Sequence, residues 1–203
     1  MVRPRRSWHA DRYYHVTVRG NNRQDIFHHD PDVHEYFRIL DYAYHKYHFQ
    51  IYAYCIMNNH VHFLLRSPEV HLSKTMALIN KRYSDYFRRH YDYTGQIYEN
   101  RYFSEELSHP VSILNVGAYI HRNPIETKIP MVDTMEQYAY SSYRFYYDNV
   151  ESPFPFLCLK SLPSLLPQKR GRSPYQYALY CVDYGMKEKL DAWYRDYSID
   201  LWQ

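Results

Sequence analysis

Two histidines separated by one residue, His60 and His62, lie inside the otherwise apolar stretch AYCIMNNHVHFLLRS of residues 53–67. Alternate side chains of a β-strand point to the same face, so both imidazoles would share one face with Leu64, and Val61 and Phe63 would take the other. Two imidazoles on one face can bind a metal ion together. The chain has 13 histidines, and roughly one such pair is expected by chance, so the spacing needs support from elsewhere in the sequence.

A second pair of chemically useful side chains, Tyr119 and Asn123, lies in the stretch AYIHRNP of residues 118–124. Residues four apart in a helix lie on the same face, one turn from each other. A phenolic hydroxyl can act as a nucleophile, and an amide oxygen can bind a metal. Each pair alone fits an ordinary core, whereas a strand pair of histidines followed by a helical tyrosine and asparagine is much more specific.

The elements around the histidines follow from local patterns. Residues 13–22, YYHVTVRGNN, are aromatic and β-branched with rough alternation, which predicts a strand that ends in a turn. Residues 30–49 predict a helix with Asp30 as its N-cap, followed by Pro31. The runs QIYAYCIM and HVHFLLR predict two strands joined by Asn58 and Asn59, because asparagine tolerates the positive φ of a tight hairpin.

The clearest helical period lies in residues 72–91. Its apolar residues recur every three or four positions and form one stripe, made of Leu72, Met76, Ile79, Tyr83 and Phe87. This pattern predicts a long amphipathic helix with Tyr83 and Phe87 in the core. On other positions, three cations repeat every seven residues, in a row able to follow a phosphate backbone or simply to face solvent: Lys74, Lys81 and Arg88.

The remaining patterns complete a fold class. Residues 96–107 predict another strand, and residues 108–123 predict a helix with Pro110 in its first turn and Pro124 ending it. The order strand, helix, strand, strand, helix, strand, helix predicts an α+β fold, a ferredoxin-like βαββαβ antiparallel sheet with helices on one face. A further short helix is expected within residues 135–147.

The chain length of 203 residues favours one main domain. We divide the chain into this domain, residues 1–148, and a C-terminal extension, residues 149–203, with the proline spacing of an irregular tail and a weak helical pattern over 174–193. The sequence does not indicate a role for the extension.

Positive charge is concentrated although the formal net charge is only +3. Residues 1–25 carry a local charge of +4, residues 72–101 carry +3, and QKRGR at 168–172 adds a third basic cluster. Localised positive charge indicates a polyanionic partner such as nucleic acid, although a solvated surface with scattered counter-ions would show similar counts.

The cysteines and the hydropathy pattern indicate a compartment. Cys55, Cys158 and Cys181 form no CxxC pair, which favours a reducing cytoplasm. No run of about 18 apolar residues is present, and the first residues lack the apolar segment of a signal peptide. We therefore expect a cytoplasmic protein outside the membrane.

Taken together, five ordered blocks in residues 10–148 resemble the single-tyrosine HUH transposases, and among them the REP-associated tyrosine transposases. The blocks are YYHVTVRGNNRQDIF, MNNHVHFLLR, GQIYENRYFS, VGAYIHRNPIE and YAYSSYRFYY. The resemblance implies a ferredoxin-like fold, with His60, His62 and Asn123 as ligands of a divalent metal, Mg²⁺ or Mn²⁺. It implies Tyr119 as the nucleophile. One departure is Asn58, where relatives usually have proline. This difference affects the turn and none of the expected ligands.

The activity that this resemblance implies is cleavage and rejoining of single-stranded DNA through a 5′-phosphotyrosine intermediate, at repeats that form hairpins, by a monomer or homodimer. Histidines 15 and 121 are expected to be structural. Candidate contacts to DNA phosphates are the cations of the basic segments: Arg19, Arg23, Lys81, Arg82, Arg88 and Arg101.

Three other functions remain open from the sequence. A domesticated relative would recognise repeat hairpins without transposition, but pure binding needs neither the histidines nor the tyrosine. An RNA-binding ferredoxin-like module would leave the histidine pair unexplained and lacks an RNP-type signature. A phosphoesterase with twin histidine motifs would need a second such motif.

Overall fold

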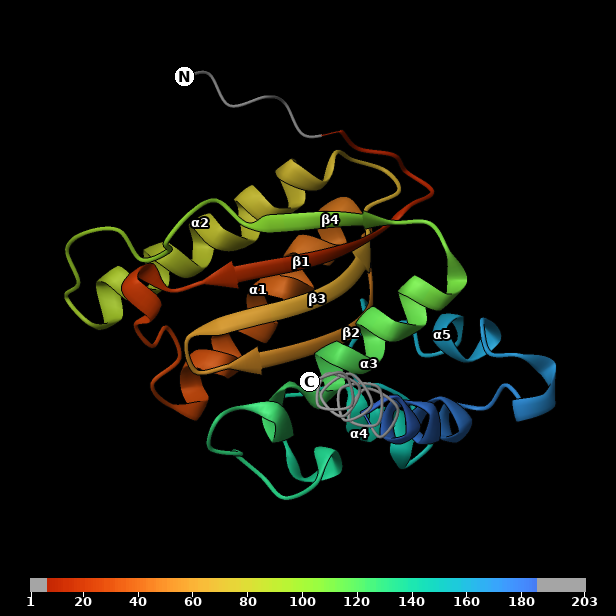
Figure 1. Cartoon of the computed structure of the whole chain (residues 1–203). Coiled ribbons are helices and arrows are strands. Elements are labelled where there is room, and N and C mark those ends of the chain that lie inside the picture. The colour runs from red at the N-terminus through yellow and green to blue at the C-terminus, as the bar shows by residue number, and fades with distance from the viewer. Residues whose placement is uncertain (1–6, 186–203) are drawn as a thin grey trace, which may run out of the picture.

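The computed structural model describes residues 7–185 and contains a four-stranded antiparallel sheet in the order β2-β3-β1-β4 (Figure 1). The strands are β1 (Tyr13–Arg19), β2 (Gln50–Met57), β3 (His60–Arg66) and β4 (Phe103–Leu107). The chain order β1-α1-β2-β3-α2-β4 with this strand order is the ferredoxin-like arrangement, which confirms the predicted fold class.

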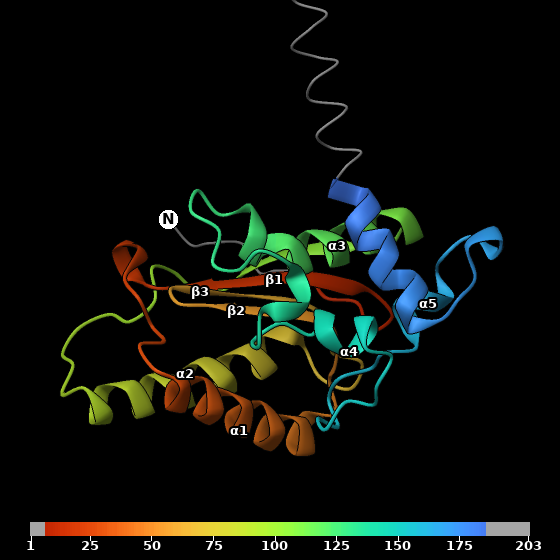
Figure 2. The same cartoon turned by 90° about the horizontal axis from the view of Figure 1, so that it is seen from below.

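The sheet is covered on both sides, as Figure 2 shows. Helices α1 (Asp30–Tyr47) and α2 (Leu72–His90) lie side by side on one face, as predicted for the two crossing helices. Their apolar stripes meet Val16, Phe63 and Leu65 of the sheet, and Tyr83 and Phe87 of α2 are buried in this core, also as predicted. Helix α3 (Pro110–Glu126) lies on the opposite face, against β2 and β3.

The strand register places both histidines of β3 on the face that α3 covers. His62 lies opposite Thr17 of β1 and Cys55 of β2, and His60 lies opposite Arg19 and Met57. Directly paired residues point to the same face of a sheet. The predicted alternation along β3 is confirmed, because Leu64 joins the core under α3 while its sequence neighbours join the other core.

The C-terminal part of the described chain packs against both cores. The peptide groups of Cys158 and Phe156 hydrogen-bond Ile51 at the edge of the sheet. Residues 174–185 are helical and pack against α3. A Cβ at Gly117 of α3 would lie 2.4 Å from the hydroxyl oxygen of Tyr177, so only glycine allows this approach. The division at residue 148 stays a prediction about chain organisation.

The remaining elements are short. They are the α-helices α4 (Tyr143–Tyr147) and α5 (Ser161–Ser164) and the 3₁₀ helices η1 (Asn21–Arg23), η2 (Met135–Gln137) and η3 (Gln168–Arg170). The predicted short helix in 135–147 is therefore two short helices. The described part of the extension, residues 149–185, is more ordered than the irregular tail that was predicted, and the end of the helix predicted over 174–193 lies outside the described residues. None of the helices in the described part of the chain is long and apolar enough to span a bilayer.

The turn between β2 and β3 differs from prediction in its backbone. Asn58 and Asn59 form the expected two-residue connection, but neither has a positive φ. The carbonyl of Asn58 accepts hydrogen bonds from the N–H groups of Ile26 and Phe27, at 2.8 and 2.9 Å. Tertiary hydrogen bonds to a distant loop hold this turn, and local sequence cannot reveal them.

Two other element boundaries were wrong. Only Phe103–Leu107 of the predicted strand 96–107 joins the sheet as a strand. Ile97, Tyr98 and Glu99 meet the end of β1 only through single backbone hydrogen bonds to Asn21 and Arg19 and an isolated bridge to Gly20. Pro124 does not end α3, which continues to Glu126. A proline in the last turn removes one backbone hydrogen bond near an end where carbonyls already lack partners, so the helix tolerates it.

The start of α1 is organised by Asp32. The N-cap is His29, so the expected cap at Asp30 was one residue late. Asp32 is fully buried. Its carboxylate accepts four hydrogen bonds, from the backbone N–H groups of His28 and His29 and from the hydroxyls of Tyr86 and Tyr91. Burial raises its pKa, but these hydrogen bonds outweigh that effect and the pKa lies below its usual value.

Asp32 is expected to make stability depend on pH in the acid range. Because its folded pKa is depressed, its stabilisation is complete above the unfolded pKa of about 3.9 and is lost as the pH falls toward the folded pKa. In urea unfolding, the wild type should therefore lose more stability between about pH 5 and pH 3 than Asp32→Asn. Asp41→Asn, at a half-exposed carboxylate of α1, is the control. Equal acid sensitivity in the wild type and Asp32→Asn would contradict this assignment.

His121 ties α3 to the sheet. It is fully buried, and its Nε2 lies 2.8 Å from Oγ of Ser142, which also accepts a hydrogen bond from the N–H of Tyr54 in β2 at 2.9 Å. The ring contacts Tyr146 and Tyr177. The expected structural role agrees with this position.

His121→Ala is expected to lower the free energy of unfolding by about 2 kcal/mol or more, because it leaves a cavity and removes a buried hydrogen bond. The measurement is urea unfolding followed by circular dichroism. His45→Ala, an exposed histidine of α1, should change stability by no more than about 0.5 kcal/mol. Equal effects of the two substitutions would show that His121 does not anchor the helix.

Candidate active site

The sheet face under α3 brings the predicted reactive residues together. The imidazole centroids of His60 and His62 are 4.9 Å apart, and the ring of Tyr119 lies edge-on to His62 at 5.6 Å. Asn123 forms a side-chain hydrogen bond with His60. Tyr119 is 41% exposed, whereas His62 is buried. An exposed phenol therefore lies beside one buried and one half-buried imidazole.

The proton on His60 has a defined position. Its Nδ1 lies 2.6 Å from Oδ1 of Asn59, an oxygen that can only accept a hydrogen bond. Nδ1 must therefore carry the proton, which leaves Nε2 unprotonated. Asn59, predicted only as a turn residue, fixes the tautomer of its neighbour.

His62 has partners for the same ring nitrogen. Its Nδ1 lies 3.0 Å from Nε2 of His15 and 3.0 Å from Oγ1 of Thr17, and the His15 and His62 rings stack at 5.3 Å. Both partners can accept a proton from Nδ1, and in that tautomer the Nε2 of His62 is unprotonated. His15 and Thr17 were not among the predicted site residues. Alternation along β1, which puts His15, Thr17 and Arg19 on one face, is the signal that could have identified them.

The three imidazoles are held in their neutral form. The pKa of His60 is lowered to about 4, first by burial and then by the charge of Arg19, against the opposing hydrogen bond with Asn123. Burial also lowers the pKa of His62 well below its usual value, with smaller effects of the neighbouring histidines and Arg19. Burial lowers that of His15, opposed by Glu105. Neutral imidazoles are the form that binds metal ions.

Asn123 is oriented by its own helix. Its Nδ2 donates a hydrogen bond to the backbone carbonyl of Tyr119 at 2.9 Å, so Oδ1 is left for other partners, and His60 lies within reach. The described residues contain no group of three His, Cys, Asp or Glu side chains placed to hold a metal, so the third ligand here would be this amide oxygen. Two imidazole nitrogens and one amide oxygen fit an oxygen-tolerant divalent ion such as Mn²⁺ or Mg²⁺.

Cys55, five residues before His60 in the sequence, lies beside this group. It pairs with His62 across β2 and β3, is buried, and its thiol donates to the sulfur of Met57 at 3.5 Å. Burial raises the pKa of this thiol, so it stays protonated and is a poor metal ligand. Cys55 therefore adds no ligand to the predicted set of two histidines and an asparagine.

The six candidate DNA-contact residues have different surroundings in the structure. Arg19 and Arg101 line a cavity of about 270 Å³ with Thr17 on the histidine side of the sheet, and Arg88 and Arg101 line a second cavity beside α2. Arg23 lies exposed in η1.

The other two candidates have different surroundings. Lys81 pairs with Asp85 at 2.7 Å on the surface of α2. Arg82 stacks over the ring of Tyr42 of α1 at 3.6 Å. Of the predicted row on α2, Lys74 and Arg88 line the second cavity, whereas Lys81 does not.

Comparison with known proteins places this geometry in a family. No curated protein matches the chain. The solved structure of a REP-associated tyrosine transposase bound to a REP hairpin is similar in fold, with a TM-score of 0.60 over 75% of this chain and 89% of that one, at 18% identity. The family model described as "Transposase IS200 like" matches residues 9–123, more than half of the chain, and this range contains His60, His62, Tyr119 and Asn123. The chain therefore belongs to the IS200-like transposase family.

Proposed function

We propose that the protein cleaves and rejoins single-stranded DNA, with Tyr119 as the nucleophile. The observation that carries this proposal is the convergence of an exposed phenol with two neutral imidazoles that meet their neighbours through Nδ1 and an amide that reaches His60. Two imidazoles and an amide are ligand types that a divalent metal accepts, and here they lie beside a hydroxyl able to act as a nucleophile.

The chemistry balances as a transfer of the phosphoryl group. Oη of Tyr119 attacks the scissile phosphorus, and the bond from phosphorus to the 3′ oxygen breaks. The phenolic proton passes to solvent, and the departing 3′ oxygen takes a proton from solvent. The products are a 5′-phosphotyrosine and a free 3′-OH strand end. Attack by a 3′-OH on the phosphotyrosine reverses the step and rejoins a strand, so the bond energy is kept. Strand transfer follows from the same groups without hydrolysis.

A divalent ion would be held by His60, His62 and Asn123. A free phenol has a pKa of about 10, so only about 0.1% is ionised at pH 7, and supplying phenolate costs roughly 4 kcal/mol. When bound, Mg²⁺ or Mn²⁺ supplies charge that polarises a phosphate oxygen and stabilises the departing 3′ oxygen. The chain contributes orientation: Asn59, His15 and Thr17 hold the ligand rings, and α3 holds Tyr119 beside them.

The substrate is proposed to be single-stranded DNA at hairpin-forming repeats. Arg19 and Arg101 place positive charge beside the histidines, where phosphates would lie. The similar solved structure is bound to a REP hairpin, which supports this class of DNA for the present chain. Tyr119 lies against His62 of its own chain, and this supports attack within one subunit, in a monomer or a homodimer acting in the cytoplasm.

Tyr119→Phe is expected to abolish the covalent intermediate. Wild-type protein is incubated with Mn²⁺ and labelled single-stranded hairpin DNA from the repeats flanking its gene, then separated on a denaturing gel. A protein-DNA adduct should form with the wild type and with Tyr175→Phe, a tyrosine of equal exposure, 41%, outside the site. No adduct should form with Tyr119→Phe. DNA binding without an adduct in any of the proteins would favour a DNA-binding relative that does not cut.

His15→Ala is expected to weaken Mn²⁺ binding about tenfold, because His62 loses one of the partners that orient its ring, and second partners of this kind are worth about 10- to 100-fold. The effect should lie at the lower end because Thr17 remains. Titration by electron paramagnetic resonance of free Mn²⁺ gives the affinity without DNA. His9→Ala, at an exposed histidine paired with Glu106, is the control. Unchanged affinity in His15→Ala would exclude the orienting role.

A further inference from the structure

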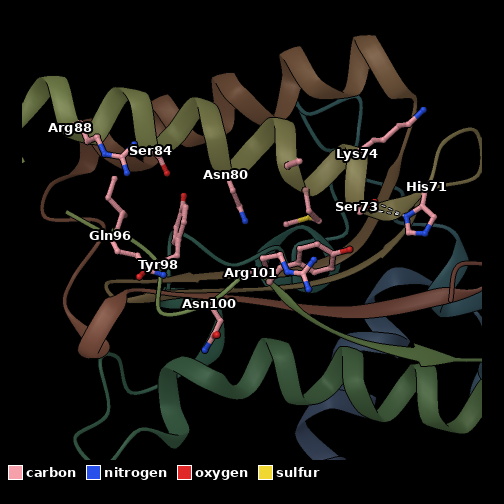
Figure 3. A pocket seen from close by; sticks show the side chains of 14 residues that line it. His71, Ser73, Lys74, Asn80, Ser84, Arg88, Gln96, Tyr98, Asn100 and Arg101 are labelled. Atoms are coloured by element: carbon pink, nitrogen blue, oxygen red, sulfur yellow. Dashed lines mark hydrogen bonds between the residues drawn. The ribbon is translucent and has the colours of Figure 1, made fainter. Parts of the chain in front are cut away.

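A second cavity, of about 860 Å³, lies between α2 and the segment 96–102, on the other side of the sheet edge from the histidines (Figure 3). This volume lies within the range of small-molecule sites. The α2 side contributes Lys74, Ala77, Asn80 and Arg88, and the opposite wall comes from the segment that failed to join β4. The irregular backbone of 96–102 therefore creates this space.

The lining combines flat rings, amides and cations. Tyr98 and Tyr102 are largely buried and present aromatic surface, and Gln96 and Asn100 add amide groups. Oδ1 of Asn80 is buried and has no hydrogen-bond partner among the described residues. A buried acceptor without a protein partner is costly, so a donor from water or from a bound ligand usually satisfies it. The exocyclic amino group of a nucleobase is a suitable donor.

Cations stand where a phosphate of the same nucleotide would lie. Lys74, Arg88 and Arg101 line the cavity and are exposed. Stacking on aromatic rings combined with a cationic groove is the general way in which proteins bind single-stranded nucleic acid. The lining therefore fits a nucleotide better than an apolar ligand.

The cavity adjoins the smaller one on the histidine side of the sheet. Asn100 and Arg101 line both this cavity and the smaller one that contains Thr17 and Arg19. A strand held by Arg19 on the histidine side would therefore pass Asn100 and Arg101 on its way to the second cavity.

We propose that this cavity receives an unpaired nucleobase of the DNA strand, next to the nucleotides at Tyr119. The inference rests on the proposed function in that the same strand is the substrate. The base stacks on the tyrosine wall and donates to Asn80, and the cations hold its phosphate. The cavity thereby fixes the position of the strand relative to the scissile bond.

The test uses binding of a defined strand, without metal, so that it does not depend on cleavage. A single-stranded oligonucleotide selected by the wild-type protein from a random pool is labelled with fluorescein, and each nucleotide in turn is replaced by an abasic one. Ala77→Phe fills the cavity from an exposed position of α2. His34→Phe, at an exposed position of α1, is the matched control. Affinity is measured by fluorescence anisotropy.

Abasic replacement at one or two positions should weaken binding about 5- to 150-fold for the wild type and for His34→Phe. The same replacements should change binding by Ala77→Phe less than about twofold, because the base has no place to go in that variant. If no abasic position matters to the wild type, or if Ala77→Phe responds as the wild type does, the inference is overturned. Free deoxynucleoside monophosphates that bind in an Ala77-dependent way, with no abasic effect, would also overturn it.

The outcome is separable from that of the proposed function. The adduct assay with Tyr119 is run on the same oligonucleotide. If an adduct forms but no abasic replacement weakens binding, the proposed strand cleavage by Tyr119 stands and the cavity inference is overturned. An abasic effect that Ala77→Phe removes, with no adduct, supports the cavity and contradicts cleavage by Tyr119.

Discussion

The register between β1 and β3 is the constraint on which the rest of the structure depends. Thr17 opposite His62 and Arg19 opposite His60 place a hydroxyl, a guanidinium and two imidazoles on one face. A slip of one residue in either strand would turn its side chains to the other face, where α1 and α2 form the larger core. Burying His62 there without its partners would cost about 1 to 3 kcal/mol or more per unsatisfied group. The apolar face and the polar face therefore enforce the same register.

The histidines of β3 can be buried on the α3 side of the sheet because each one hydrogen-bonds its partners through one ring nitrogen, Nδ1. Asn59 occupies Nδ1 of His60, and His15 and Thr17 occupy Nδ1 of His62. Burial keeps the imidazoles neutral, so no uncompensated charge is placed under α3. The hydrogen bonds that stabilise the buried histidines are therefore the same ones that orient their rings.

Much of this arrangement could be predicted from the sequence because two short periods carry it. The alternation around His60 and His62 fixed their common face, and the four-residue spacing of Tyr119 and Asn123 fixed their common side of α3. Contacts across strands could not be predicted in this way: His15 and Cys55 join the site only through pairing.

The segment 96–102 was misassigned for a different reason. Its composition is strand-like, but burial of the adjacent residues Ile97 and Tyr98 bends it over α2. That departure from the local pattern produces the larger cavity, and it places Asn100 and Arg101 between that cavity and the histidines. Packing against α2 therefore outweighed the strand propensity of this segment.

The position of Tyr119 depends on residues far from it in sequence. One side of helix α3 packs against the sheet, and the helix at residues 174–185 packs against part of its opposite side. Gly117 admits the hydroxyl of Tyr177, and the guanidinium of Arg122 donates to the carbonyl of Cys181 at 3.1 Å. These contacts flank Tyr119 along the helix, so a change in the C-terminal segment is expected to move Tyr119, the proposed nucleophile, relative to the histidines without contacting either. The C-terminal segment is thus mechanically part of the site, although none of its described residues lies among the predicted ligands.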